Sequence, residues 1–266
     1  MVVKLNQKQI IRYKRQIDLP EIGEKGQEKL LKARVLIIGT GGLGSPCSLY
    51  LAAAGIGTLG IVDSDKVELG NLQRQILHSE DYIDLPKVKS AKDRLSKLNA
   101  DIKVIPYNIR INKTNIIGIL DEYDIVVDCS DNFQTRYLIN DACILYGKPL
   151  FYGAINQFFG QVTTIFPRES ACLRCLFLES SSLNEKLSDQ QLGVLGVVPG
   201  MIGIIQASEV IKYVLGAGRL LNEKLLIIDI LELKFEKLNT HRNNHCIVCG
   251  DNPIIKELKD YDQILY

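Results

Sequence analysis

The sequence lacks tryptophan altogether, has only two methionines and three histidines, and carries no excess of either charge. Its 32 lysine and arginine residues stand against 31 acidic ones, so net charge favours neither nucleic acid nor an anionic membrane as a partner. No apolar run reaches the roughly 20 residues of a membrane span, and the N-terminus lacks the apolar core of a signal peptide. We therefore expect a cytoplasmic protein without membrane or nucleic-acid partners.

Cysteine is also scarce, since seven in 266 residues are too few for a disulfide-stapled secreted scaffold. Four of the seven form two CxxC pairs: Cys172, Cys175, Cys246 and Cys249. Four thiolates in this pairing are typical of a closed, tetrahedral Zn²⁺ site with a structural role. We expect this zinc to pin the C-terminal segment to the domain, with His245 as a neighbour and not a ligand. The other three cysteines are expected to be small buried residues.

Apolar strand-like runs alternate with helical patterns over the first half of the chain. The expected strands are 35–38, 59–63, 103–107, 125–129 and 150–152, and the expected helices are 46–54, 87–98, 113–120 and 135–146. Gly55 and Gly147 stand where glycine commonly ends a helix. Strand–helix alternation gives parallel strands with right-handed crossovers, so we expect an α/β fold with a Rossmann-like, doubly wound sheet.

The second half has a different pattern. Residues 160–166 alternate like a strand, 176–196 are polar without periodicity and predict a loop, and 199–215 form an apolar helical pattern closed by Gly216. Residues 225–230 and 233–238 predict an antiparallel pair. The mostly parallel sheet is therefore expected to continue into antiparallel strands.

A glycine cluster follows the first expected strand in "RVLIIGTGGLG". Gly39, Gly41 and Gly44 match G-x-G-x-x-G, and Asp63 ends the second expected strand. Glycine lets a phosphate approach the backbone, the next helix turns its first amides toward the anion, and Asp63 can accept hydrogen bonds from ribose hydroxyls. The motif predicts a nucleotide but leaves open whether it is ATP or a dinucleotide such as NAD.

Charged and amide side chains follow the later strand ends and favour ATP. They are Asp65, Asn71, Arg74, Gln75, Lys87, Asp131 and Asn132. Two cations can neutralise phosphates and a carboxylate can hold Mg²⁺, a demand that a dinucleotide does not make. An NAD-dependent oxidoreductase remains the alternative from another enzyme class, and a nucleotide-binding scaffold without turnover is a third hypothesis.

Several stretches together resemble a known family. "RYKRQ", "VLIIGTGGLG", "VDSDKVELGNLQRQILH", "PKVKSA", "DCSDN" and the paired CxxC motifs are similar to the ThiF/MoeB/HesA adenylyltransferases, the bacterial relatives of ubiquitin-activating enzymes. The resemblance covers 8–252. It implies a single adenylation domain over 1–252, with a nucleotide-binding half at 30–153, a carrier-binding and zinc half at 154–252, and a tail at 253–266.

The resemblance implies an activity. Members of this family use ATP and Mg²⁺ to adenylate the C-terminal glycine carboxylate of a small ubiquitin-like sulfur carrier ending in Gly-Gly, and they release pyrophosphate. The acyl-adenylate then serves sulfur transfer in thiamin, molybdopterin or related biosynthesis. A peptide or an RNA base is the alternative substrate within the family. The resemblance also implies a homodimer.

Roles for single residues follow from the same resemblance. Gly42 joins the nucleotide turn, and the phosphate site is lined by Gly70, Asn71, Leu72, Gln73 and Arg74. The implied catalytic residues are Arg74 and Lys87 on the phosphates, Asp131 on Mg²⁺ or on the carrier carboxylate with Asn132 beside it, and Arg15, an arginine finger from the other subunit.

The sequence departs from part of the family at one position. Many members carry a cysteine in the crossover loop where this chain has Gln191. We therefore expect adenylation without a thioester or acyl-disulfide step, with sulfur delivered by another protein. The tail "NPIIKELKDYDQILY" resembles the linker that precedes a rhodanese domain in longer relatives. A separate sulfurtransferase partner is the hypothesis that this tail motivates.

Overall fold

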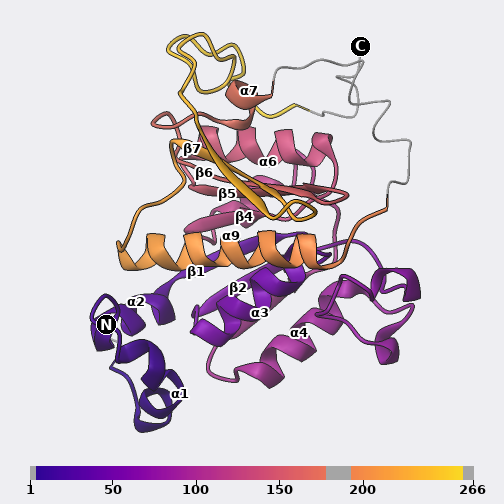
Figure 1. The fold of residues 1–266 in the computed structure, drawn as a ribbon, viewed down its shortest axis with the longest axis vertical. Coiled ribbons are helices and arrows are strands. Elements are labelled where there is room, and N and C mark those ends of the chain that lie inside the picture. Colours follow the sequence, from indigo (N-terminus) through magenta and orange to yellow (C-terminus); the bar gives the residue numbers. More distant parts are fainter. Residues whose placement is uncertain (1–3, 178–192, 260–266) are drawn as a thin grey trace.

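A single eight-stranded sheet forms the centre of the protein (Figure 1). This computed structural model describes residues 4–177 and 193–259. The strand order is β3-β2-β1-β4-β5-β6-β7-β8, in which neighbours from β3 to β5 are parallel and those from β5 to β8 are antiparallel. The expected Rossmann-like sheet that continues into antiparallel strands is confirmed.

The strands are β1 Arg34–Ile38, β2 Thr58–Val62, β3 Lys103–Tyr107, β4 Ile125–Asp128, β5 Leu150–Asn156, β6 Phe159–Ile165, β7 Lys224–Asp229 and β8 Lys234–Asn239. Most begin and end close to the expected positions. The exception is β5, which runs beyond the expected end at Tyr152 and turns at Gln157, with φ 54°, into β6. Its extra residues pair with β6. Pairing between two strands depends on the fold and does not show in the local sequence pattern of either one. Residue 153, the expected boundary between the two halves, lies within β5.

The helices are α1 Gln7–Ile17, α2 Gly23–Lys32, α3 Gly44–Ala54, α4 Lys87–Leu98, α5 Ile116–Leu120, α6 Phe133–Tyr146, α7 Leu173–Leu176 and α9 Val197–Leu215. Short 3₁₀ turns lie at Leu69–Asn71 and Glu80–Tyr82. Gly55, Gly147 and Gly216 end α3, α6 and α9 in the left-handed conformation, as expected. Most of the expected loop at 176–196, Gln191 and the end of the tail lie outside the described residues.

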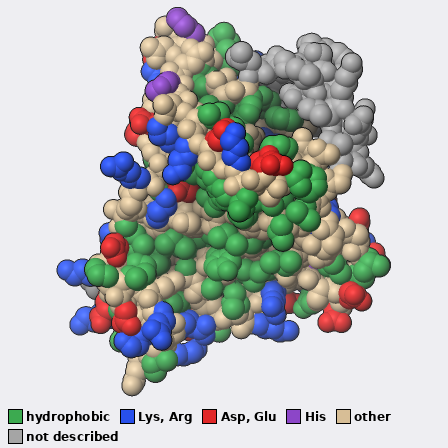
Figure 2. Space-filling view, in the orientation of Figure 1, with side chains coloured by type: hydrophobic (Ala, Val, Ile, Leu, Met, Phe, Trp, Pro, Cys, Tyr) green, Lys and Arg blue, Asp and Glu red, His purple; other side chains and the backbone are tan. Residues whose placement is uncertain are grey.

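Helix α9 crosses one face of the sheet, and Figure 2 shows hydrophobic side chains gathered across the middle of that face. Among the described residues it is the one helix long and apolar enough to cross a membrane. It packs against β5, β6 and α3. Its buried Gln206 donates from Nε2 to the carbonyl oxygens of Asp128 at 2.7 Å and Phe151 at 3.0 Å. The buried apolar residues of α9, Ile202, Ala207 and Val210, thus belong to the core on which the helix lies.

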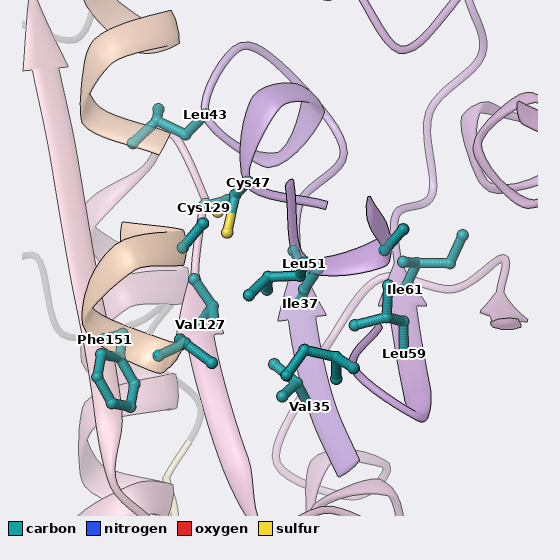
Figure 3. Close-up of a cluster of buried hydrophobic side chains, with 14 of the residues drawn as sticks. Val35, Ile37, Leu43, Cys47, Leu51, Leu59, Ile61, Val127, Cys129 and Phe151 are labelled. Carbon is teal, nitrogen blue, oxygen red and sulfur yellow. The ribbon is translucent and has the colours of Figure 1, made fainter. Parts of the chain in front are cut away.

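Two apolar layers lie on opposite faces of the sheet because alternate residues of a strand point to opposite faces. In β1, Val35 and Ile37 join the layer under α3, α4 and α9, which Figure 3 shows in close-up, and Leu36 and Ile38 join the layer under α5 and α6. A parallel strand buried on both faces reads as a continuous apolar run, as this one does. The second layer also contains Cys172, Cys246 and Cys249.

Helices α1 and α2, which the apolar pattern did not reveal, lie at the amino ends of the first strands. Gln16 of α1 donates to the carbonyl oxygen of Ala54 at the end of α3, and Asn99 donates to the Tyr13 hydroxyl at 2.8 Å. Helix α3 has 11 residues, which span about 16 Å at 1.5 Å per residue. Since α3 begins at the glycine turn, α1 lies at the opposite end of α3 from that turn.

Candidate functional site

The glycine turn between β1 and α3 is closed by contacts that only glycine permits. Gly39 has φ 96°, and a Cβ there would lie 2.5 Å from the Cys129 carbonyl oxygen. A Cβ on Gly44 would lie 2.0 Å from the Gly39 carbonyl oxygen. Cys129 directly follows β4, so the turn is packed against the backbone that leads to Asp131. The local sequence G-x-G-x-x-G is therefore required by sterics at two of its three glycines.

Asp63 holds the glycine turn from the next strand. Its Oδ2 accepts hydrogen bonds from the Thr40 backbone N–H at 2.8 Å and the Thr40 hydroxyl at 2.9 Å, and its Oδ1 accepts from the Asp65 N–H at 2.9 Å. A carboxylate has about four acceptor positions, so room remains for a ribose hydroxyl. Sequence reasoning missed Thr40, which occupies the first variable position of the motif.

His78 ties the same turn to α4. Its Nε2 lies 3.0 Å from the Thr40 carbonyl oxygen and its Nδ1 3.0 Å from the Ser90 hydroxyl. A carbonyl only accepts, so Nε2 carries the proton and Nδ1 accepts from Ser90. Burial lowers the pKa of His78, and the charge of Lys87 lowers it further. With both ring nitrogens engaged, His78 does not offer the acid–base group that an oxidoreductase requires.

Arg74 reaches the glycine turn from the segment after β2. Its guanidinium donates from Nη2 to the Asn71 side-chain oxygen at 2.9 Å and from Nη1 to the Gly70 carbonyl at 3.3 Å. A Cβ on Gly42 would lie 3.7 Å from Arg74 Cγ and 3.0 Å from Pro199 Cβ at the start of α9. Gly42 therefore lets the turn, Arg74 and α9 approach one another.

Gln75 is a buried neighbour of the turn with an unsatisfied acceptor. It is 5% exposed, its Oε1 has no hydrogen-bond partner within the described residues, and its Nε2 would lie 3.6 Å from a Cβ on Gly41. Leu72 and Gln73 complete the segment, and a Cβ on Gly196 would lie 2.5 Å from the Gln73 carbonyl oxygen. A buried acceptor of this kind fits a ligand that brings hydroxyl or amino donors.

Lys87 provides a second cation from the start of α4. Its side chain is only 6% exposed, and its Nζ donates to Oδ2 of Asp65 at 2.9 Å, whereas the Asp65 side chain is 65% exposed. The Lys87 N–H also donates to the Asp65 carbonyl oxygen. A buried ammonium held by one exposed carboxylate is well suited to bind an anionic ligand.

Asp131 and Asn132 lie in the loop between β4 and α6, two and three residues after Cys129, whose carbonyl lies against Gly39. Asp131 is exposed, and its Oδ1 accepts from the Asn132 side chain at 3.3 Å. The Asn132 side-chain oxygen accepts from the Thr135 N–H at 2.9 Å and caps α6. The cap accounts for Asn132 locally, while the Asp131 carboxylate remains at the surface beside the site.

Arg15 is not gathered with the other predicted residues of its own chain. It is exposed on α1, at the far end of α3 from the glycine turn. The remaining residues approach the turn from the carboxyl ends of β1, β2 and β4, where ligands bind in this architecture. Two cations, a glycine-rich turn and an unsatisfied buried acceptor fit a nucleotide that carries several phosphates.

The four paired cysteines form a second, separate cluster. All four Sγ atoms lie within 4.8 Å of one another, with Cys172 and Cys175 3.8 Å apart, Cys172 and Cys246 3.6 Å apart, and Cys175 and Cys249 3.4 Å apart. Tetrahedral zinc with Zn–S bonds of about 2.3 Å places sulfurs about 3.8 Å apart. The cluster fits a structural zinc ion, and the exposed His245 is not part of it.

Helix α6 holds the first CxxC pair in place. Arg174, between the two cysteines, donates from Nε to Asp141 at 2.9 Å, and both side chains are almost fully buried. The Leu173 N–H donates to the Asn140 side-chain oxygen at 2.9 Å. The sequence showed the ligands but not this attachment. Of the cysteines outside the cluster, Cys47, Cys129 and Cys143 are buried as expected, and burial raises the pKa of Cys129 and Cys143.

Comparison with known proteins agrees with this geometry. The ThiF family matches residues 13–248. The sulfur carrier protein adenylyltransferase of Thermus thermophilus is 44% identical over 265 residues, 98% of this chain and 98% of that relative. The adenylyltransferase and sulfurtransferase MOCS3 of Culex quinquefasciatus is 46% identical over 98% of this chain, which spans only 60% of that relative. The crystal structure of E. coli MccB with ATP is similar with a TM-score of 0.79 and 28% identity, over 92% of this chain and 75% of that one.

Loss of one cysteine ligand should remove the metal and destabilise the protein. For Cys249→Ser we expect less than one tenth of the wild-type zinc content by elemental analysis. We also expect a loss of stability on the order of 4 kcal/mol, or a fall in Tm of about 10 °C at about 2–4 °C per kcal/mol. His245→Ala is the matched control and should keep both zinc and Tm. Zinc retained by Cys249→Ser, or lost by His245→Ala, would contradict the assignment.

His78 should make stability depend on pH. Because the folded-state pKa lies below the unfolded value of about 6.5, the unfolded chain binds a proton that the folded chain does not. Stability should therefore fall as pH drops below about 6.5, by about 1.4 kcal/mol for each unit between the two pKa values. His78→Gln keeps a donor for Thr40 but cannot titrate, so its urea-unfolding free energy should change less between pH 7.5 and 5.5. If the unfolding free energies of wild type and His78→Gln changed equally with pH, His78 would not be the source of the pH dependence.

Proposed function

The chain belongs to the ThiF family, and from this we propose that it is an ATP-dependent adenylyltransferase for the C-terminal glycine carboxylate of a small ubiquitin-like sulfur carrier. One observation carries the proposal: a guanidinium, Arg74, lies beside Gly42 of the glycine turn, and a buried ammonium, Lys87, lies at the start of α4. The Thermus relative, named a sulfur carrier protein adenylyltransferase, matches the chain almost end to end.

The proposed reaction is an in-line displacement at phosphorus. The carrier carboxylate attacks the α-phosphorus of ATP, the bond to the bridging oxygen of the β-phosphate breaks, and pyrophosphate leaves with that electron pair. Arg74 and Lys87 neutralise the negative charge that builds up on the phosphates, and Asp63 orients the ribose. Asp131 would hold Mg²⁺, which supplies further charge neutralisation, or would position the carrier carboxylate.

A homodimer would complete the site with Arg15 of the other subunit. Arg15 is exposed and lies at the end of α3 remote from the glycine turn, so it does not serve the site of its own chain. The face on which α9 lies offers a surface for a second copy, because α9 exposes Val197, Ile204 and Tyr213 and Figure 2 shows apolar side chains gathered there. Apolar side chains gathered on an exposed face are a common feature of protein–protein contact sites.

Adenylation alone is proposed for this chain. The expectation that no thioester step occurs depends on Gln191, which lies outside the described residues. We propose that a separate sulfurtransferase delivers the sulfur after the acyl-adenylate has formed.

The function is tested by carrier-dependent exchange of labelled pyrophosphate into ATP. We expect exchange only with a ubiquitin-like carrier ending in Gly-Gly, and a loss of at least about 100-fold in Lys87→Ala and Asp131→Asn. Lys92→Ala, an exposed lysine on the same helix as Lys87, is the matched control and should retain full activity. Absence of exchange with every such carrier from the same genome would overturn the proposal.

The shared site is tested by mixing two inactive variants. Arg15→Ala and Lys87→Ala should each be inactive alone but recover about one quarter of wild-type activity after subunit exchange, because mixed dimers contain one complete site. A mixture of Lys87→Ala and Asp131→Asn should stay inactive. Each subunit supplies both residues to its own site, so each site of a mixed dimer lacks one of them. A monomeric protein by light scattering, or mixed dimers of the first pair without activity, would contradict the role of Arg15.

A further inference from the structure

Ser130 is held from two sides by buried charged residues that the proposed reaction does not use. Asp128 ends β4 and is 0% exposed, and its Oδ1 accepts from the Ser130 N–H at 2.9 Å and the Ser130 hydroxyl at 2.6 Å. Arg136, in the first turn of α6 and 8% exposed, donates from Nη2 to the Ser130 carbonyl oxygen at 3.1 Å. We call Asp128, Ser130 and Arg136 the Ser130 clamp.

The Ser130 clamp is made of groups that are costly to bury. Within the described residues, Asp128 Oδ2 and Arg136 Nε have no hydrogen-bond partner. Burial raises the pKa of Asp128, and the charge of Arg136 opposes that shift. Uncharged side chains can fix a loop without such a cost. Local violations of polar satisfaction tend to occur at functional sites, so this arrangement indicates more than a structural tie.

The clamp fixes the backbone on the amino-terminal side of Asp131. The N–H and hydroxyl of Ser130 donate to Asp128, and its carbonyl accepts from Arg136. On the other side of Asp131, Asn132 is fixed because its side chain caps α6. Asp131 lies between these two anchors with an exposed side chain. The backbone position of Asp131 is therefore set by its two neighbours, and its carboxylate also accepts from the Asn132 side chain.

The clamp is itself locked into the fold. The Arg136 guanidinium lies over the rings of Phe133, at 5.4 Å, and Tyr152, at 5.8 Å. The Asp128 carbonyl oxygen accepts from Gln206 of α9 at 2.7 Å. The end of β4 is thereby attached to α6 on one face of the sheet and to α9 on the other.

We propose that Asp128 and Arg136 are positioning residues that hold Asp131 in its reactive orientation through the backbone of Ser130. The proposal rests on the proposed function, because it requires Asp131 to act at the phosphates. In this proposal neither Asp128 nor Arg136 touches the substrate. Each acts on the reaction only through the place that it gives to Asp131.

The first test separates turnover from nucleotide binding. Asp128→Ala and Arg136→Met should each lower kcat for pyrophosphate exchange by about 10- to 100-fold, because a misplacement of about 1 Å can cost that much. ATP affinity measured calorimetrically without carrier should stay within about threefold, since Arg74 and Lys87 lie on other segments. Arg136→Lys keeps a cationic donor and should recover part of the loss. Gln134→Ala, in the same turn of α6, is the matched control with unchanged kcat.

The second test asks whether the effect passes through Asp131. In an Asp131→Asn background, Asp128→Ala should lower the residual exchange no further, because the group that it positions is already gone. Hydrogen exchange should show lost protection in a peptide spanning 128–135, with the glycine turn unchanged. If Asp128→Ala does not fold, Asp128→Asn and Ser130→Ala replace it, with a smaller loss expected.

The outcomes distinguish this proposal from the function on which it rests. If Asp131→Asn leaves exchange intact, the role of Asp131 in the proposed function fails. If Asp131→Asn loses most of its exchange but Asp128→Ala lowers exchange by the same factor in both backgrounds, Asp128 acts independently of Asp131 and the positioning proposal fails. Unchanged kcat in Asp128→Ala and Arg136→Met would overturn it as well.

Discussion

The contact between Gly39 and the Cys129 carbonyl oxygen brings two strand ends together and thereby defines the site. Without a Cβ at Gly39, β1 and β4 end side by side, and the loop to Asp131 starts against the glycine turn. Thr40, the next residue, then meets Asp63 from β2 and His78. A single methyl group at Gly39 would prevent this approach of two backbones.

Electrostatic balance is the second constraint on the site. Lys87 is buried, but its carboxylate partner, Asp65, is exposed, so one end of the ion pair stays in contact with solvent. The same division recurs after β4, where Asp128 is buried and Asp131 is exposed. In both places a buried charge fixes the position of a group and an exposed charge faces the solution. Polar groups that are fixed before a ligand arrives need little reorganisation when charge develops on it.

The sequence predicted what depends on local pattern. The parallel strands, the glycine turn and the CxxC pairs could be recognised because alternation, steric need and ligand spacing are written in short stretches. Helix α1 was missed because most of its residues are polar and Tyr13 is its only buried residue. The role of His78 and the attachment of Arg174 to Asp141 could not be predicted, since each joins segments far apart in the chain. The role of Asp128 could not be predicted, because its burial and its place opposite Arg136 depend on how β4 and α6 pack.

Within the described residues, the edge strands of the sheet are β3 and β8, and both carry features that disfavour pairing with a further strand. A free edge strand offers unpaired N–H and C=O groups to another chain and invites aggregation. At one edge, β3 contains Pro106, which has no N–H to donate. At the other edge, every residue of β8 is exposed and three of its six residues are charged, Lys234, Glu236 and Lys237. Both edges thus resist further strand addition, which favours a discrete particle over a fibre.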